Sequence, residues 1–353
     1  MYHTTNAEVP RRAHPDRLAN AVATQMVSYL LAENPAARAD IDAMLAGGKK
    51  GASVYIAGNV ATTLSQRQLN DRAREAVSVC ARRCGYTAAT GFNPDDFELA
   101  TNFTPQSPEL THNAEYGGAG DTRTVIGYAC NETGRLLPRA VVAAEQIAGR
   151  LDAGLLPYLR PDGKVQVVYA DGRPTVIIAV QHEPGVTAAE LRRDLFPWVC
   201  GAIGTEDVDL IVKPFVNGGP VVDKGTSNTK RGIYGEAIPH YGGGPWGKDG
   251  SKPEVSGLVA ARALARKAVQ HGADEYSVAL TYPLGAQHPL VTMNWNADLK
   301  NARVVLRKSR DDITNLSPEW LAQAYRLRDA ELFDRIAQTS FIGNEALPWE
   351  RTD

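Results

Sequence analysis

The chain has 353 residues, and its 38 lysines and arginines nearly balance its 40 aspartates and glutamates, for a formal net charge of -2. This balance excludes the strong positive charge that is typical of proteins binding nucleic acid or an acidic membrane surface. The apolar runs are too short to cross a bilayer, and the first residues lack the apolar core of a signal peptide. We therefore expect a cytoplasmic protein with neither a nucleic-acid nor a membrane partner.

Helix signals recur along the chain, most of them where a helix would begin. Pro15 stands in the first turn of an apolar-periodic segment, and Pro138 opens another. Ser65, Thr187 and Ser317 are suitable N-cap residues, the second within a capping-box pattern. The predicted helices cover residues 18–32, 66–85, 139–151, 188–203, 255–269 and 318–338.

Short runs rich in β-branched and aromatic residues predict strands between these helices. They cover residues 53–57, 124–129, 165–169, 175–181, 208–212, 277–282 and 290–295. Asp171 and Gly172 join two of them as a hairpin. Many connections are too short for parallel crossovers, so the pattern favours an α+β fold with antiparallel sheets.

One stretch suits a polyphosphate ligand. Lys248, Lys252 and Glu254 follow the glycine run 242–244 and directly precede a predicted helix. Ammonium groups neutralise phosphate oxygens, a carboxylate can hold the bridging Mg²⁺, and a helix N-terminus adds positive potential. The alternative is an ordinary solvated loop.

Other segments also contain residues that could bind a polyphosphate. His14 and Asp16 open a helix, Asp121 ends the glycine-rich segment 117–120, and Lys164 stands at the entry to a strand. Each also has a plain structural interpretation: a favourable first-turn charge, a turn and a surface lysine. The segment 215–223 offers an aromatic ring, a glycine turn and a carboxylate, and the ring is either core or a platform for adenine. Without an evident nucleophile, this set favours catalysis by positioning and charge neutralisation.

Six motifs, in order along the chain, resemble those of the S-adenosylmethionine synthetases. The first two are HPDR at 14–17, which resembles GHPDK, and GAGD at 118–121 followed by IGYACNET. The others are LLPYLRPDGKVQV at 155–167, FVNGGPVVD at 215–223, HYGGGPWGKDGSK at 240–252 and LPWERTD at 347–353. The matches run from residue 14 to the end of the chain, so the resemblance covers nearly all of it.

The resemblance implies a fold and a reaction. The fold has three pseudo-threefold-related α+β subdomains, which we expect at residues 1–110, 111–216 and 217–353. The reaction transfers the adenosyl group of ATP to the methionine sulfur, and the triphosphate is then cleaved to pyrophosphate and phosphate. Two Mg²⁺ ions per site are implied, and K⁺ is a further expected cofactor. The implied assembly is a homodimer with active sites at the subunit interface, which in some arrangements pairs into a tetramer.

The resemblance also implies a role for particular residues. His14 would stabilise the leaving group, and Lys252 would lie between the sulfur substrate and the triphosphate. The remaining roles are phosphate binding by Lys164, Lys230, Arg231 and Lys248; ATP binding by Asp162, Phe215 and Asp223; contact with the amino acid by Asn59, Gln106, Asp121 and Asp223; Mg²⁺ binding by Asp16 and Glu254; and K⁺ binding by Asp42.

Some positions depart from the family pattern. Asn59 stands where the family glutamate binds the methionine ammonium, unless the alignment slips beside residues 47–51; losing that charge in a desolvated site would cost about 1–3 kcal/mol. Thr229 replaces an arginine, unless Lys230 and Arg231 are the matching pair. The shortened loop at Pro245 puts the K⁺ site in doubt. We therefore hypothesise a divergent enzyme that uses methionine poorly or accepts another thioether; the remaining alternative is a triphosphate-binding paralogue that acts as a tripolyphosphatase.

Overall fold

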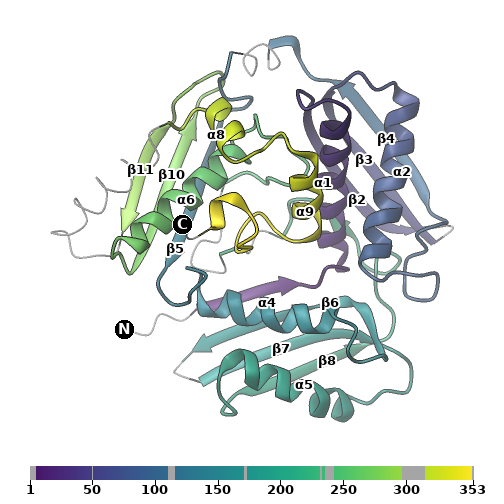
Figure 1. The fold of residues 1–353 in the computed structure, drawn as a ribbon. Helices are drawn as coiled ribbons and strands as arrows, with labels where there is room; N and C mark the ends of the chain where they lie inside the picture. The colour runs from purple at the N-terminus through teal and green to yellow at the C-terminus, as the bar shows by residue number, and fades with distance from the viewer. Residues whose placement is uncertain are drawn as a thin grey trace.

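The computed structural model describes residues 5–49, 51–109, 116–170, 173–230, 233–234, 242–295 and 315–351. These residues form three sheets, with helices packed against them (Figure 1). The helices Pro15–Glu33 and Ala330–Gln338 lie in the middle of the molecule, whereas Gln66–Arg83 and Ala188–Ile203 lie at its edges (Figure 1). Among the described residues most neighbouring strands are antiparallel, and two pairs are parallel: Gly51–Ala61 with Glu98–Pro105, and Arg173–His182 with Asp209–Phe215. The predicted α+β class is confirmed.

Each sheet combines strands from distant parts of the chain. The first has the order β1 (Thr5–Pro10), β6 (Leu159–Ala170), β7 (Arg173–His182), β8 (Asp209–Phe215). The second is β11 (Leu290–Trp295), β10 (Glu275–Tyr282), β5 (Arg123–Cys130), and the third is β4 (Glu98–Pro105), β3 (Gly51–Ala61), β2 (Arg38–Gly48), β9 (Gly225–Thr226). Strands β1, β5 and β9 thus pair outside the sequence ranges expected for their subdomains, and the proposed limits remain a prediction.

Five of the six predicted helices occur, and side-chain caps mark where three of them begin. They are α1 (Pro15–Glu33), α2 (Gln66–Arg83), α4 (Arg139–Asp152), α5 (Ala188–Ile203) and α6 (Ser256–Gln270). Ser65 and Thr187 both form complete capping boxes. Helix α1 is buried on nearly every side because β2, α2 and α9 (Ala330–Gln338) all pack against it.

The single helix predicted over residues 318–338 is wrong. The chain forms α8 (Pro318–Ala324) and α9 (Ala330–Gln338), with a break between them. Arg326 adopts a left-handed conformation with φ of 58°, which ends the first helix. Asp329 then caps the second by accepting a hydrogen bond from the Glu331 N–H. The apolar periodicity continues across the break, so the sequence pattern predicts one helix where the chain forms two.

The strand predictions are confirmed, although β1, β2, β4 and β9 were missed. Residues 171 and 172 lie outside the described residues, and the two strands that they connect pair antiparallel, with Ala170 opposite Arg173. None of the helices in the described part of the chain is long and apolar enough to cross a membrane.

Candidate active site

His14 and Asp16 are fixed at the start of α1. The imidazole Nδ1 caps the helix by accepting a hydrogen bond of 3.2 Å from the Asp16 N–H. The Asp16 carboxylate in turn accepts one of 2.9 Å from the Thr226 N–H of β9. Both side chains are buried. Asp16, in the first turn of α1, therefore also connects this helix to β9, within the glycine-rich part of the chain before residue 250.

Asp162 and Phe215 meet at a neighbouring turn. Asp162 is buried and accepts hydrogen bonds from the N–H groups of Gly163 at 2.6 Å and Gly219 at 2.8 Å. A Cβ atom added to Gly218 would lie 2.9 Å from the Phe215 ring and 3.0 Å from the Asp162 carboxylate. The absence of a side chain at Gly218 therefore lets the Phe215 ring and the Asp162 carboxylate both pack against the backbone of this turn.

The electrostatics of this region favour a neutral histidine. Burial lowers the pKa of His14 below its ordinary 6.5, and the nearby carboxylates of Asp162 and Asp16 offset this only in part. Burial likewise raises the pKa of Asp162. Because Nδ1 accepts a hydrogen bond, the proton of neutral His14 lies on Nε2, which is left as a donor. Asp223 is exposed and also acts electrostatically on His14. We call His14, Asp16, Asp162 and Asp223 the α1 cluster.

Two of the predicted phosphate lysines share one carboxylate, which the sequence analysis missed. Lys230 Nζ lies 2.7 Å from Glu8 Oε1, and Lys164 Nζ lies 3.2 Å from Oε2. Gln166 also donates to Glu8. Burial alone would raise the pKa of Glu8, but the hydrogen bonds and charges of the two lysines outweigh it and lower the pKa. Glu8 was not predicted as a partner of these lysines because its strand, β1, was not predicted.

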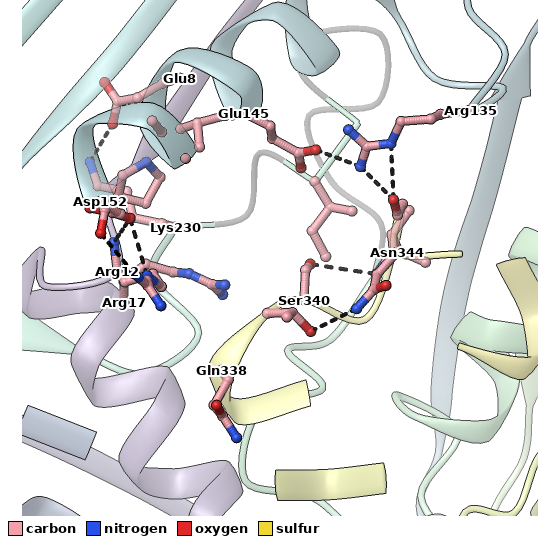
Figure 2. Close-up of a pocket in the computed structure, with 18 of the residues that line it drawn as sticks. Glu8, Arg12, Arg17, Arg135, Glu145, Asp152, Lys230, Gln338, Ser340 and Asn344 are labelled. Carbon is pink, nitrogen blue, oxygen red and sulfur yellow. Dashed lines mark hydrogen bonds and ion pairs between the residues drawn. The ribbon is translucent and has the colours of Figure 1, made fainter. Parts of the chain in front are cut away.

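A cavity of about 740 Å³ opens beside Glu8 and Lys230 (Figure 2). It lies between β1, α1, α4 and the segment 338–345. Ion pairs along its wall join Arg12 to Asp152 and Arg135 to Glu145. Much of the charge on the wall is thus balanced within the chain itself.

A second group of charged residues, which we call the α6 cluster, precedes helix α6. It contains Asp40, Arg123, Lys248, Lys252 and Glu254. Lys248 Nζ lies 3.0 Å from Asp40 and 3.2 Å from Glu254. Lys252 Nζ lies 3.6 Å from Asp40 and donates to the Gly120 carbonyl at 3.2 Å. Burial would lower the pKa of Lys248, but Glu254 and Asp40 outweigh this and raise it, so the lysine stays charged. Asp40 and Arg123 were not predicted.

Glu254 suits a cation. Its side chain has no exposed surface. Oε1 receives Arg123 at 3.0 Å, whereas the buried Oε2 has no hydrogen-bond partner among the described residues. A buried carboxylate oxygen without a donor is costly unless a ligand or metal satisfies it. In the ranges that the structure describes, no three His, Cys, Asp or Glu side chains are placed so that they could hold one metal ion together, so Mg²⁺ would need other oxygens, such as those of phosphates, besides Glu254 or Asp16.

Three of the four residues predicted to contact the amino acid lie near the α6 cluster, whereas the fourth, Asp223, belongs to the α1 cluster. Asn59 of β3 stands directly opposite Asp40 of β2. Gln106 follows β4, and its backbone N–H donates to Val60. Asp121 lies 3.8 Å from Arg123.

The α1 and α6 clusters are not joined directly in one chain: within the described residues, no hydrogen bond or ion pair connects them. Asp42, the predicted K⁺ ligand, stands two residues after Asp40 on β2 and accepts hydrogen bonds from Ser227 at 2.5 Å and from Asn228 at 3.1 Å. Arg231 lies outside the described residues. The two groups together present lysines, carboxylates and one neutral histidine, as an enzyme acting on a polyphosphate requires.

Comparison with known proteins identifies the family. Residues 116–217 match the central domain of S-adenosylmethionine synthetase, and residues 217–351 match its C-terminal domain. An S-adenosylmethionine synthase from Nitratiruptor sp. is 30% identical over 98% of this chain and 95% of its own length. S-adenosylmethionine synthase 1 from Rhodospirillum rubrum is 31% identical over 99% and 96%. The chain belongs to the S-adenosylmethionine synthetase family.

A solved structure has the same fold. It is an unusual S-adenosylmethionine synthetase from Campylobacter jejuni, with a TM-score of 0.84 and 22% sequence identity, matched over 100% of this chain and 97% of that one. The family prediction from sequence motifs is thus confirmed.

Proposed function

We propose that this protein transfers the adenosyl group of ATP to the sulfur of L-methionine. The observation that carries the proposal is the gathering of Lys248, Lys252 and a buried, partly unsatisfied Glu254 directly before α6. Such a group can hold a triphosphate and its metal while leaving no side chain positioned as a nucleophile. A thioether needs no general base, which fits this set of residues.

His14 would act on the departing triphosphate. Its Nε2–H donates a hydrogen bond to the oxygen that gains charge as the C5′–O5′ bond breaks and the sulfur lone pair forms the new bond to C5′. Lys164 and Lys230 leave Glu8 to bind phosphate oxygens. Mg²⁺, held by Asp16 and Glu254, supplies further charge neutralisation when bound.

Within the described residues the two clusters are not joined directly, which supports an active site shared between two subunits. A homodimer would place the α1 cluster of one subunit against the α6 cluster of the other. Phe215 would then stack on the adenine, while Asp162 and Asp223 would hold the nucleoside. Each chain would contribute half of two equivalent sites.

Asn59 favours a second candidate, the same transfer to a different or modified thioether amino acid. A tripolyphosphatase without transfer is the third, and the amino-acid-side residues speak against it because triphosphate cleavage alone does not need them.

A product assay tests the proposal. The protein is incubated with ATP, Mg²⁺ and K⁺, with and without methionine, and the products are identified by mass spectrometry. S-adenosylmethionine with pyrophosphate and phosphate is the expected result. Phosphate release alone would indicate the tripolyphosphatase, and product only with another thioether would indicate the second candidate.

A further inference from the structure

A row of polar side chains crosses the third sheet beside the α6 cluster. Lys248 forms an isolated bridge to Asp40, Asp40 stands opposite Asn59, and Asn59 stands opposite Thr104. Directly opposed residues in a sheet present their side chains on one face, with Cβ atoms about 5 Å apart. The Asn59 amide confirms this closeness, because its Nδ2 donates to the Thr104 hydroxyl at 2.7 Å.

We propose that Asp40 supplies the carboxylate that receives the ammonium group of the α-amino-acid substrate. This inference rests on the proposed adenosyl transfer and says which residue recognises the amino acid. Asn59 of β3 has no charge, and Asp40 is the residue directly opposite it on the neighbouring strand β2. The site therefore keeps a negative charge, which lies on β2 and not on β3.

Asp40 has the surroundings of a cation-binding carboxylate. Its side chain keeps 27% of its surface exposed, and it already binds two ammonium groups, those of Lys248 and Lys252. Arg123, Lys248 and Lys252 exceed in number the two carboxylates of the cluster, Asp40 and Glu254. When a triphosphate draws the lysines to its own oxygens, Asp40 loses its partners and is open to a third ammonium.

Gln106 provides an independent sign of a ligand at this place. It follows Thr104 by two residues, on the same sheet edge, and its N–H is bound to the Val60 carbonyl. The side chain is more than nine-tenths buried, yet its Oε1 has no hydrogen-bond partner in the described part of the chain. An orphaned amide oxygen is an acceptor awaiting a donor such as an ammonium N–H.

The geometry also explains why residue 59 is not a glutamate here. Like charges directly opposed across two strands destabilise a sheet. A glutamate at position 59 would face Asp40 in that way. A carboxylate at both positions would therefore destabilise the sheet.

A charge-relocation experiment tests the proposal. Asp40→Asn should raise the KM for methionine about ten- to hundredfold by removing a charge-assisted hydrogen bond, while the KM for ATP changes less than about threefold. The double variant Asp40→Asn/Asn59→Glu should recover most of the methionine affinity. Asn59→Glu alone should not improve on the parent protein. Glu98→Gln, the same chemical change at the far end of β4, is the control.

The outcomes separate this proposal from the proposed function. If the parent protein makes no adenosyl product from methionine, the function is overturned. If it makes the product but Asp40→Asn raises the KM for ATP and methionine equally, or the double variant is not rescued, Asp40 only balances the lysines and the inference fails. Should Asp40→Asn not fold, the parent protein and the Asn59→Glu variant are each assayed with methionine and with its des-amino analogue. Equal use of both by the parent protein would overturn ammonium recognition.

Discussion

His14 has two duties that two substitutions can separate. Nδ1 caps α1, and Nε2 is left to donate to a ligand. In His14→Asn the amide oxygen can still cap the helix but no donor reaches the Nε2 position, so we expect a loss of kcat of about a hundredfold or more with little change in stability. In His14→Gln the side-chain amide N–H can reach closer to the position of Nε2, but the cap of α1 is lost. The free energy of unfolding should therefore fall by about 1 kcal/mol, while kcat falls less than in His14→Asn. Steady-state kinetics and thermal unfolding measure both. Equal kinetic loss in the two variants would contradict the division.

The lowered pKa of His14 sets the sign of its pH dependence. The folded protein favours the neutral imidazole because burial disfavours the charged form. Above the ordinary pKa of 6.5 the ring is neutral and caps the helix; as the pH falls from 6.5 through the lower pKa of the folded state, Nδ1 is protonated, and both the cap and stability are lost. We expect kcat to stay level down through pH 6.5 and to fall only at more acidic pH, where protonation of Nδ1 breaks the cap and the ring is no longer held beside the leaving-group oxygen. In His14→Gln this acid limb should disappear from the profile.

At the scale of elements, the contact of α1 with β9 holds Asp16 in place. A Cβ atom on Gly225 would lie 2.1 Å from the Pro15 carbonyl, and the next residue donates to Asp16. Gly225→Ala should therefore push β9 away from α1, destabilise the protein by about 1–3 kcal/mol and lower activity because Asp16 loses its partner. Unfolding in urea and the product assay check both effects.

Gly149 offers the matched control, since it lies within helix α4 and a Cβ atom there would meet nothing within 4 Å. Gly149→Ala should stabilise the protein by about 0.5–1 kcal/mol and leave turnover unchanged. If the two alanine variants were equally stable, the tight approach of β9 to α1 would not constrain the fold.

The same scale shows what the sequence could predict. The starts of helices could be predicted from local signals, such as the capping boxes at Ser65 and Thr187, because a capping box is formed by two residues that are three apart in the sequence. Strand β2 was missed because aspartate and alanine have low strand propensity, although its polar and apolar residues do alternate, with Asp40 and Asp42 on the open face. The gathering of Asp40, Arg123 and Glu254 could not be read from the chain, since it depends on pairing between distant strands. Motif resemblance placed Glu254 near the substrate, but nothing local marked its two partners.

At the scale of the whole molecule, the closing LPWE motif ties together distant parts of the chain. Glu350 pairs with the fully buried Arg262 of α6 at 2.9 Å, and Arg262 also donates to the carbonyls of Tyr128 and Leu136. The Trp349 indole donates to the Phe341 carbonyl. The motif therefore fastens the C-terminal segment to α6 and to the end of β5, and its role here is structural.

Removing one member of that buried pair should be costly. Glu350→Gln leaves the Arg262 charge without its counter-ion in a site that water does not reach, so we expect a loss of about 3–5 kcal/mol in the free energy of unfolding. Glu75→Gln breaks an exposed pair with Arg72 and should cost at most about 0.5 kcal/mol. Because α6 begins directly after Glu254, a destabilised α6 should lower activity only near the unfolding temperature, whereas at low temperature kcat should match that of the parent protein. Reduced kcat at every temperature would mean that the C-terminal segment also sets the geometry of the α6 cluster.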